Sequence, residues 1–188
     1  MIRGIGRRVL LRSGIALGVG LHVQRHAAFA QDDRASLRPQ AGDLLVKAGD
    51  SGLKPLTPDD ILLGSKQTLA WAMDAADRMV RNGSRLNQIL LVRLDATALV
   101  AETAARAAAG VVAYTAICTH TGCEVGEWLA DEHLLHCPCH FSKFDPKDGA
   151  RVVDGPAPRT LPALPLVLIE GKLSVAKPFT ARVGFETA

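Results

Sequence analysis

The sequence predicts an all-β protein, an antiparallel β barrel or sandwich with one short helix. Short aliphatic and β-branched runs recur along the chain, and glycine, proline or other turn residues bound each of them. Some of these runs come in pairs at hairpin spacing. Many short strands joined by turns favour a closed or two-sheet antiparallel architecture.

Individual strands are predicted from composition and flanking turns. Leu44–Lys47 lies between two glycine–aspartate pairs, Gln88–Leu94 is the continuous aliphatic run that a buried strand needs, and Val111–Ile117 has the same character. Two hairpins follow from paired runs, namely Glu127–Leu129 with His133–His136 and Leu166–Glu170 with Leu173–Lys177.

The helix is predicted over the alanine-rich stretch Ala96–Ala109, because Asp95 is a suitable N-cap and Gly110 a suitable C-terminal stop. A single helical turn is predicted at Thr57–Asp60, within a segment otherwise rich in turn residues. Residues 66–74 carry no decisive pattern.

The charge distribution argues against a nucleic-acid-binding protein. The formal net charge is +3, but five of the 22 basic residues and none of the 19 acidic ones lie in residues 1–30. The remaining chain has 17 basic and 19 acidic residues. No basic surface for nucleic acid is therefore expected. The length of 188 residues allows one domain.

Residues 1–30 have the order of a secretory signal. Arg7 and Arg8 precede an apolar stretch over residues 13–23, and Ala28-Phe29-Ala30 forms a small-residue cleavage site. The apolar run of about 11 residues is shorter than the roughly 20 that span a bilayer, which favours a cleaved signal. A membrane anchor is the alternative, and a soluble helix is a further one. The segment GRRVLLR resembles the twin-arginine export signal, which carries proteins already folded around a cofactor.

The expected organisation is therefore a twin-arginine-like signal peptide at residues 1–30, a linker at 31–42 and one domain at 43–188. The protein is expected to be periplasmic or otherwise exported, with membrane anchoring as the alternative.

All four cysteines and two of the six histidines lie in two boxes, CTHTGC (Cys118–Cys123) and CPCHFSKFD (Cys137–Asp145). Such a concentration in a small domain indicates disulfides, a metal site or both. Zinc is one alternative, but zinc sites usually keep cysteine pairs and histidine pairs apart. Here each box combines one cysteine with one histidine, as C-x-H in the first box and C-x-x-H in the second. A two-iron cluster in which one iron takes both thiolates and the other both imidazoles fits this mixture.

The two boxes resemble those of Rieske 2Fe–2S proteins, specifically the high-potential branch. The match extends over about residues 111–166 and includes GPAPRTLP (Gly155–Pro162), which is similar to the proline-bearing third loop of that family. The resemblance implies a Rieske-type antiparallel barrel or sandwich with a small cluster-binding subdomain at about residues 115–160. It also implies one 2Fe–2S cluster. The ferredoxins of ring-hydroxylating oxygenases share the ligand spacings but lack the two additional cysteines.

Carried over residue by residue, the resemblance implies a ligand set and a disulfide. One iron is bound by Cys118 and Cys137, the other by His120 and His140, and a disulfide joins Cys123 to Cys139. That disulfide would close a loop of about 15 residues, worth roughly 3 kcal/mol in the chain-entropy model.

The resemblance further implies three residues around the cluster, Ser142, Phe144 and Pro156. Ser142 keeps a serine that donates to a bridging sulfide in the family, whereas Phe144 replaces a tyrosine that donates to a cysteine sulfur. We therefore predict a lower reduction potential than in the tyrosine-bearing members. Phe141 stands where the respiratory members usually have glycine, and the form CPCHFSKFD is nearer to the small subunit of arsenite oxidase.

The expected function is one-electron transfer, as the small subunit of, or carrier for, a periplasmic oxidoreductase similar to arsenite oxidase. The alternative is the Rieske iron–sulfur subunit of a quinol–cytochrome c oxidoreductase. The expected partners are redox proteins, either a larger oxidoreductase subunit or a cytochrome, within a membrane complex if the signal is not cleaved. In both cases the chain is an electron-transfer subunit rather than a catalyst alone, and no catalytic residue is predicted.

Overall fold

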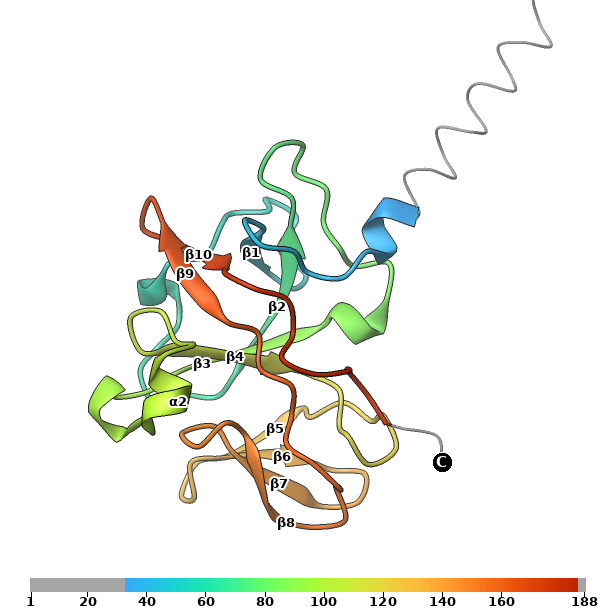
Figure 1. Cartoon of the computed structure of the whole chain (residues 1–188), viewed down its shortest axis with the longest axis vertical. Helices are drawn as coiled ribbons and strands as arrows, with labels where there is room; N and C mark the ends of the chain where they lie inside the picture. Colours follow the sequence, from blue (N-terminus) through green and yellow to red (C-terminus); the bar gives the residue numbers. More distant parts are fainter. Residues whose placement is uncertain (1–32, 186–188) are drawn as a thin grey trace, which may run out of the picture.

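The computed structural model describes residues 33–185, which form two antiparallel β-sheets (Figure 1). The predicted signal peptide and its export or anchoring lie outside these residues, as does the start of the predicted linker. Among residues 33–185, no helix is both long and apolar enough to cross a bilayer.

The larger sheet has six strands in the order β4-β3-β2-β1-β10-β9. Its members are β1 (Leu44–Lys47), β2 (Thr68–Met73), β3 (Ile89–Arg93), β4 (Val111–Thr115), β9 (Leu166–Ile169) and β10 (Lys172–Val175). The smaller sheet has the order β5-β6-β7-β8, with β5 (Glu127–Leu129), β6 (Leu134–Cys137), β7 (Ser142–Asp145) and β8 (Arg151–Asp154). In Figure 1 the smaller sheet lies below the larger one.

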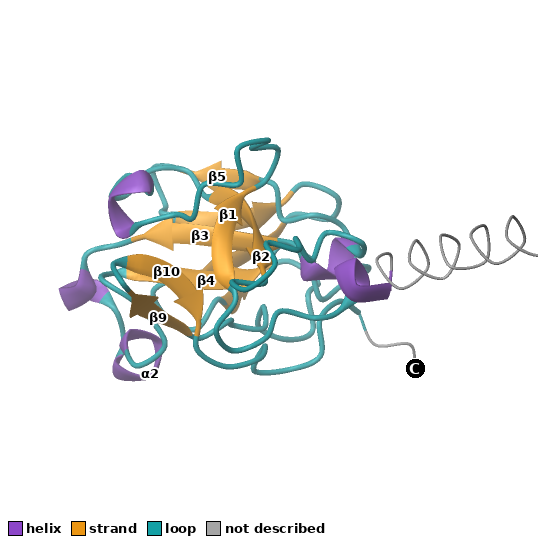
Figure 2. Cartoon of the chain, turned by 90° about the horizontal axis from the view of Figure 1, so that it is seen from above, coloured by secondary structure: helices purple, strands orange, loops and turns teal. Residues whose placement is uncertain are grey.

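Helical segments are short and lie around the sheets (Figure 2). The 3₁₀ helices are η1 (Pro58–Asp60), η2 (Arg85–Asn87) and η3 (Ala96–Ala98), and the α-helix α2 covers Ala101–Ala104. Residues 33–36 are also helical.

The core consists of two hydrophobic clusters that share strand β3. Leu90 and Val92 point into the cluster between the two sheets, whereas Ile89 and Leu91 point into the cluster enclosed by the larger sheet. All four side chains are fully buried. A strand buried on both faces needs a continuous apolar run, which explains why no polar–apolar alternation is seen in Gln88–Leu94.

The predicted all-β class and the strands and hairpins named above are confirmed. The predicted helix over Ala96–Ala109 is wrong in its length, because tertiary contacts interrupt it. The Val100 N–H donates to the Lys147 carbonyl, and Ala108 forms an isolated β-bridge with Val111. Asp95 does act as a cap, since its carboxylate accepts the Thr97 N–H at 2.9 Å.

A buried ion pair ties the start of the domain to the segment after β2. The guanidinium of Arg81 donates to both carboxylate oxygens of Asp43, at 2.6 and 2.9 Å. Both residues are almost fully buried. The pair therefore holds the entry to β1 against the loop that leads into η2.

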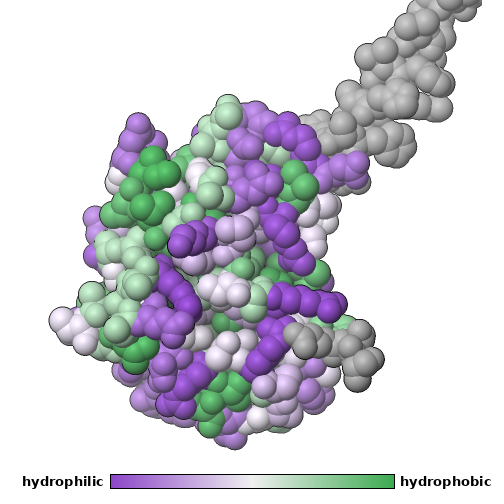
Figure 3. Space-filling view, viewed as in Figure 1, coloured by the Kyte–Doolittle hydropathy of each residue, from purple (hydrophilic) through white to green (hydrophobic). Residues whose placement is uncertain are grey.

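The outer edge of the larger sheet is apolar. Val167, Leu168 and Ile169 of β9 are each about two-fifths exposed, and apolar side chains gather over the β9–β10 hairpin (Figure 3). This surface belongs to the larger sheet, not to the sheet that carries Cys137–Asp145.

Candidate metal centre

Both boxes lie at strand ends, and backbone hydrogen bonds fix their shape. Box 1 (Cys118–Cys123) follows β4. Its turn is closed by the Cys118 N–H, which donates to the Cys123 carbonyl at 2.8 Å, and by the Gly122 N–H, which donates to the Cys118 carbonyl at 3.1 Å. Gly122 has φ +78°, which glycine adopts without a steric penalty.

Box 2 (Cys137–Asp145) contains the turn between β6 and β7. Cys137 pairs with Ser142 across the ladder, and the Phe141 N–H donates to the Cys137 carbonyl at 3.0 Å. Box 2 is thus a four-residue turn followed by strand β7, a strand that was not predicted from the sequence.

The four predicted ligands are sorted by depth. Cys118 and Cys137 are free thiols, and each residue is only 1% exposed. His120 is half-buried and His140 is exposed. Their rings meet edge to face with centroids 4.7 Å apart. The structure therefore places the two thiols beside each other and the two imidazoles beside each other, with sulfur inside and imidazole outside.

The electrostatics of this group suit a bound cation. Burial, with the neighbouring thiol of Cys137 contributing, raises the pKa of the Cys118 thiol to about 11, against a smaller lowering by hydrogen bonds that include one from Ser142. A buried thiolate pair is costly without a compensating positive charge. In addition, Nδ1 of His120 is buried and has no hydrogen-bond partner among residues 33–185. These residues fit a metal centre with thiolate and imidazole ligands.

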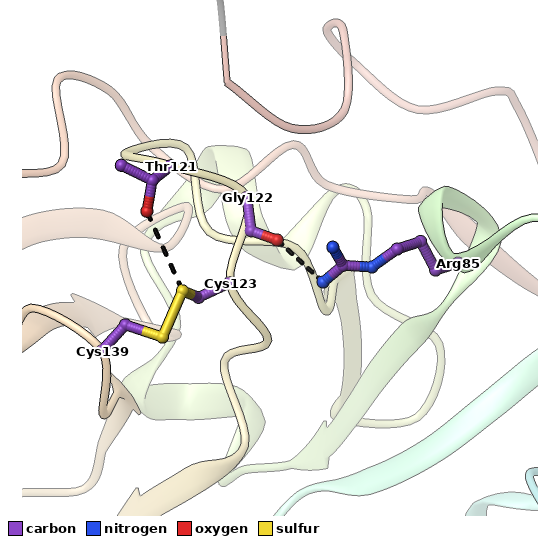
Figure 4. Close-up of a disulfide and its surroundings, with 5 residues drawn as sticks. All are labelled: Arg85, Thr121, Gly122, Cys123 and Cys139. Atoms are coloured by element: carbon purple, nitrogen blue, oxygen red, sulfur yellow. Dashed lines mark hydrogen bonds between the residues drawn. A yellow bond between two sulfur atoms is a disulfide. The ribbon is translucent and has the colours of Figure 1, made fainter.

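A disulfide joins Cys123 to Cys139, as predicted, with their Cα atoms 6.5 Å apart (Figure 4). The Sγ atoms of these two residues and of Cys137 all lie within 4.8 Å of one another. Because two of the three sulfurs are bonded to each other, this trio is not itself a ligand set. The short distances show instead that the disulfide lies directly against one predicted ligand.

The third loop, Gly155–Pro162, is hydrogen-bonded to both boxes. The Ala157 N–H donates to Ser142 Oγ at 3.1 Å, and the Thr119 hydroxyl donates to the Arg159 carbonyl at 2.7 Å. A Cβ added to Gly155 would lie 2.5 Å from Ser142 Cα, so only glycine allows this approach. Pro156 lies in this loop and is exposed.

Phe144 is fully buried on β7 and belongs to the same hydrophobic cluster as Cys118 and Cys137. It has no hydroxyl to donate. The one tyrosine of the chain, Tyr114, donates its hydroxyl to the Pro146 carbonyl at 2.8 Å. Neither residue therefore supplies a phenol hydrogen bond to a cysteine sulfur.

Two contacts to the boxes were missed by the sequence analysis. Arg85 of η2 donates from Nη2 to the Gly122 carbonyl at 2.8 Å (Figure 4), and nothing in the sequence links residues 37 positions apart. His136, taken for an ordinary strand position, is 8% exposed, and its Nδ1 lies 2.7 Å from Glu127 Oε2. The hairpin register opposing Glu127 to His136 was the available signal.

Comparison with known proteins gives consistent matches. The family model for the Rieske [2Fe-2S] domain matches residues 70–165. The cytochrome bc1 complex Rieske iron-sulfur subunit of Streptomyces lividans is 36% identical over 149 residues, covering 76% of this chain and 85% of that protein. A putative respiratory nitrate reductase subunit Rieske of Haloferax mediterranei is 51% identical over 77 residues, covering 40% of this chain and 34% of that protein.

Among solved structures, a plasma membrane Rieske protein of the cyanobacterium Synechocystis PCC 6803 is 27% identical. The similarity covers 47% of this chain and 75% of that one, with a TM-score of 0.34.

Proposed function

Because this chain belongs to the Rieske [2Fe-2S] domain family, we propose that it is the iron–sulfur subunit of a quinol–cytochrome c oxidoreductase. The family carries one [2Fe–2S] cluster and transfers electrons through it. The observation that carries the proposal is the match to a bc1 subunit over 85% of that subunit's length. The chain spans only 34% of the Haloferax mediterranei relative, so membership of a complex is a proposal and not taken over from that relative.

We propose that Cys118 and Cys137 hold one iron and that His120 and His140 hold the other. Buried cysteines and outward imidazoles support this division, because electrons must enter and leave where the centre is nearest to solvent. When bound, the cluster takes up and releases one electron at a time. The protein supplies the binding groups, the buried environment and the hydrogen bonds around them.

The surrounding residues hold the two boxes in a fixed relation. The disulfide between Cys123 and Cys139 joins the boxes, while Ser142 and Thr119 bind the third loop to them. Such constraints keep the ligands from moving apart when the charge of the centre changes. Small rearrangement on reduction favours fast electron transfer.

The main expectation from the sequence, an arsenite-oxidase-like role, is not confirmed by the comparisons, which favour its alternative. The proposed partners are the cytochrome subunits of a membrane complex. Export or anchoring through residues 1–30 remains part of this proposal.

Affinity purification of the tagged chain from its native membranes tests the complex. We expect b-type and c-type haem absorption to co-purify in fixed proportion with the chain. Recovery of a molybdenum-containing protein without haem b would overturn the proposed complex and restore the arsenite-oxidase-like alternative. A matched Cys137→Ala variant controls for binding that does not depend on an intact centre.

A further inference from the structure

Phe141 is a large aromatic side chain left in solvent beside the candidate metal centre. It is 66% exposed, and its neighbours Pro138, Cys139 and His140 are exposed too. No lysine, arginine, aspartate or glutamate lies among residues 138–141. This part of box 2 therefore presents an uncharged surface with one aromatic ring.

The backbone at Phe141 is in an unfavourable conformation. Its φ is +63°, in the left-handed region that costs a residue with a Cβ about 1–2 kcal/mol. The turn cannot relax, because the Phe141 N–H is bonded to the Cys137 carbonyl and the flanking residues are paired in the β6–β7 ladder. Six other non-glycine residues of the described part of the chain, Glu170 among them, also have a positive φ, so this conformation alone does not assign a function to Phe141.

The ring is held in one orientation from below. It stacks on His136 with ring centroids 6.0 Å apart and an interplanar angle of 27°. His136 is buried, and Glu127 fixes its ring by the 2.7 Å contact to Nδ1. Phe141 is thus pre-organised, and little conformational entropy would be lost if another protein covered it.

We propose that Phe141 determines which protein this centre exchanges electrons with, by inserting its ring into an uncharged, apolar recess on that partner. Rigid aromatic side chains contribute much of the binding energy at interfaces. A partner without the recess would be disfavoured, because the ring would have to leave its stacking contact with His136 to move aside. The proposal rests on the proposed function only in requiring a protein redox partner.

Three variants separate recognition from structure. Phe141→Gly removes the ring and the strain together. Glu170→Gly relieves a similar left-handed residue, φ +49°, in the β9–β10 turn, and Leu168→Ala removes an exposed apolar side chain from the other sheet. The partner is the complex that co-purifies with the wild-type chain.

For Phe141→Gly we expect at least about tenfold weaker binding to that complex, with unchanged iron content, an unchanged reduction potential and stability equal to or above the wild type. Both control variants should bind like the wild type. Because the contact proposed for Phe141 is apolar, the loss should persist when the salt concentration is raised.

Equal binding by Phe141→Gly and the wild type would overturn the inference. So would a loss of binding that appears together with lost iron or lost stability, since Phe141 would then be structural. A molybdenum-containing partner would refute the proposed complex while leaving the Phe141 comparison valid.

Discussion

Gly155→Ala is expected to loosen the third loop from box 2 and to destabilise the protein strongly. The new Cβ would lie 2.5 Å from Ser142 Cα, 2.7 Å from Ser142 N and 2.8 Å from the Phe141 carbonyl oxygen. All three are backbone atoms, so no side chain can swing away. The backbone must therefore move. The hydrogen bond from the Ala157 N–H to Ser142 Oγ joins the same two segments and should be weakened by that movement.

The magnitude follows from three effects. Alanine at φ +84° costs about 1–2 kcal/mol, and overpacking costs about 1–3 kcal/mol more. Alanine also reduces the entropy of the unfolded chain, which returns about 0.4–1 kcal/mol. The net loss should be about 1–4.5 kcal/mol.

Urea unfolding measures this loss, with iron content determined on the same samples. Gly149→Ala is the matched control, because Gly149 has φ +59° but no atom within 4 Å of the added Cβ. The control should lose only about 1 kcal/mol. Equal losses in the two variants would refute the close packing of the third loop on Ser142.

Three further changes have distinct expected results. Asp43→Asn should cost about 3 kcal/mol in urea unfolding, because it leaves the buried Arg81 charge with only the longer, 3.5 Å ion pair to the more exposed Asp74, and a loss below about 1 kcal/mol would contradict this. Phe144→Tyr should raise the reduction potential in a redox titration, as an added hydroxyl can donate to sulfur, and no rise would refute that role. The pKa of Asp60 is lowered by hydrogen bonds from the Thr57 N–H and hydroxyl, and then by Lys54. A carboxylate whose pKa is lowered in the folded state stabilises the protein at pH values above the ordinary carboxyl pKa. The stability difference between wild type and Asp60→Asn should therefore vanish as the pH falls through and below about 4. A difference that stays constant with pH would argue against this role of Asp60.

The sequence predicted best what depends on local pattern. The predicted disulfide between Cys123 and Cys139 is present, and the structure pairs Cys118 with Cys137 and His120 with His140, whereas their role as ligands stays a prediction. Strands such as Gln88–Leu94 were predicted because a short aliphatic run bounded by turn residues is typical of a buried strand.

What the sequence could not predict depends on contacts between distant residues. The alanine-rich stretch after Asp95 has high helix propensity, yet contacts to Lys147 and Val111 end the helix early. The bond from Arg85 to the Gly122 carbonyl has no local signal at all. Gly155 could be recognised as a turn residue, but its close approach to Ser142 is visible only in three dimensions.

A redox titration of the purified chain, followed by EPR and accompanied by iron and zinc analysis, tests the central claim most directly. Two thiolate and two imidazole ligands on a [2Fe–2S] cluster predict a single one-electron transition within about −150 to +300 mV. A transition near about −400 mV would indicate all-cysteine ligation, and a chain that contains zinc and shows no transition would contradict the account altogether.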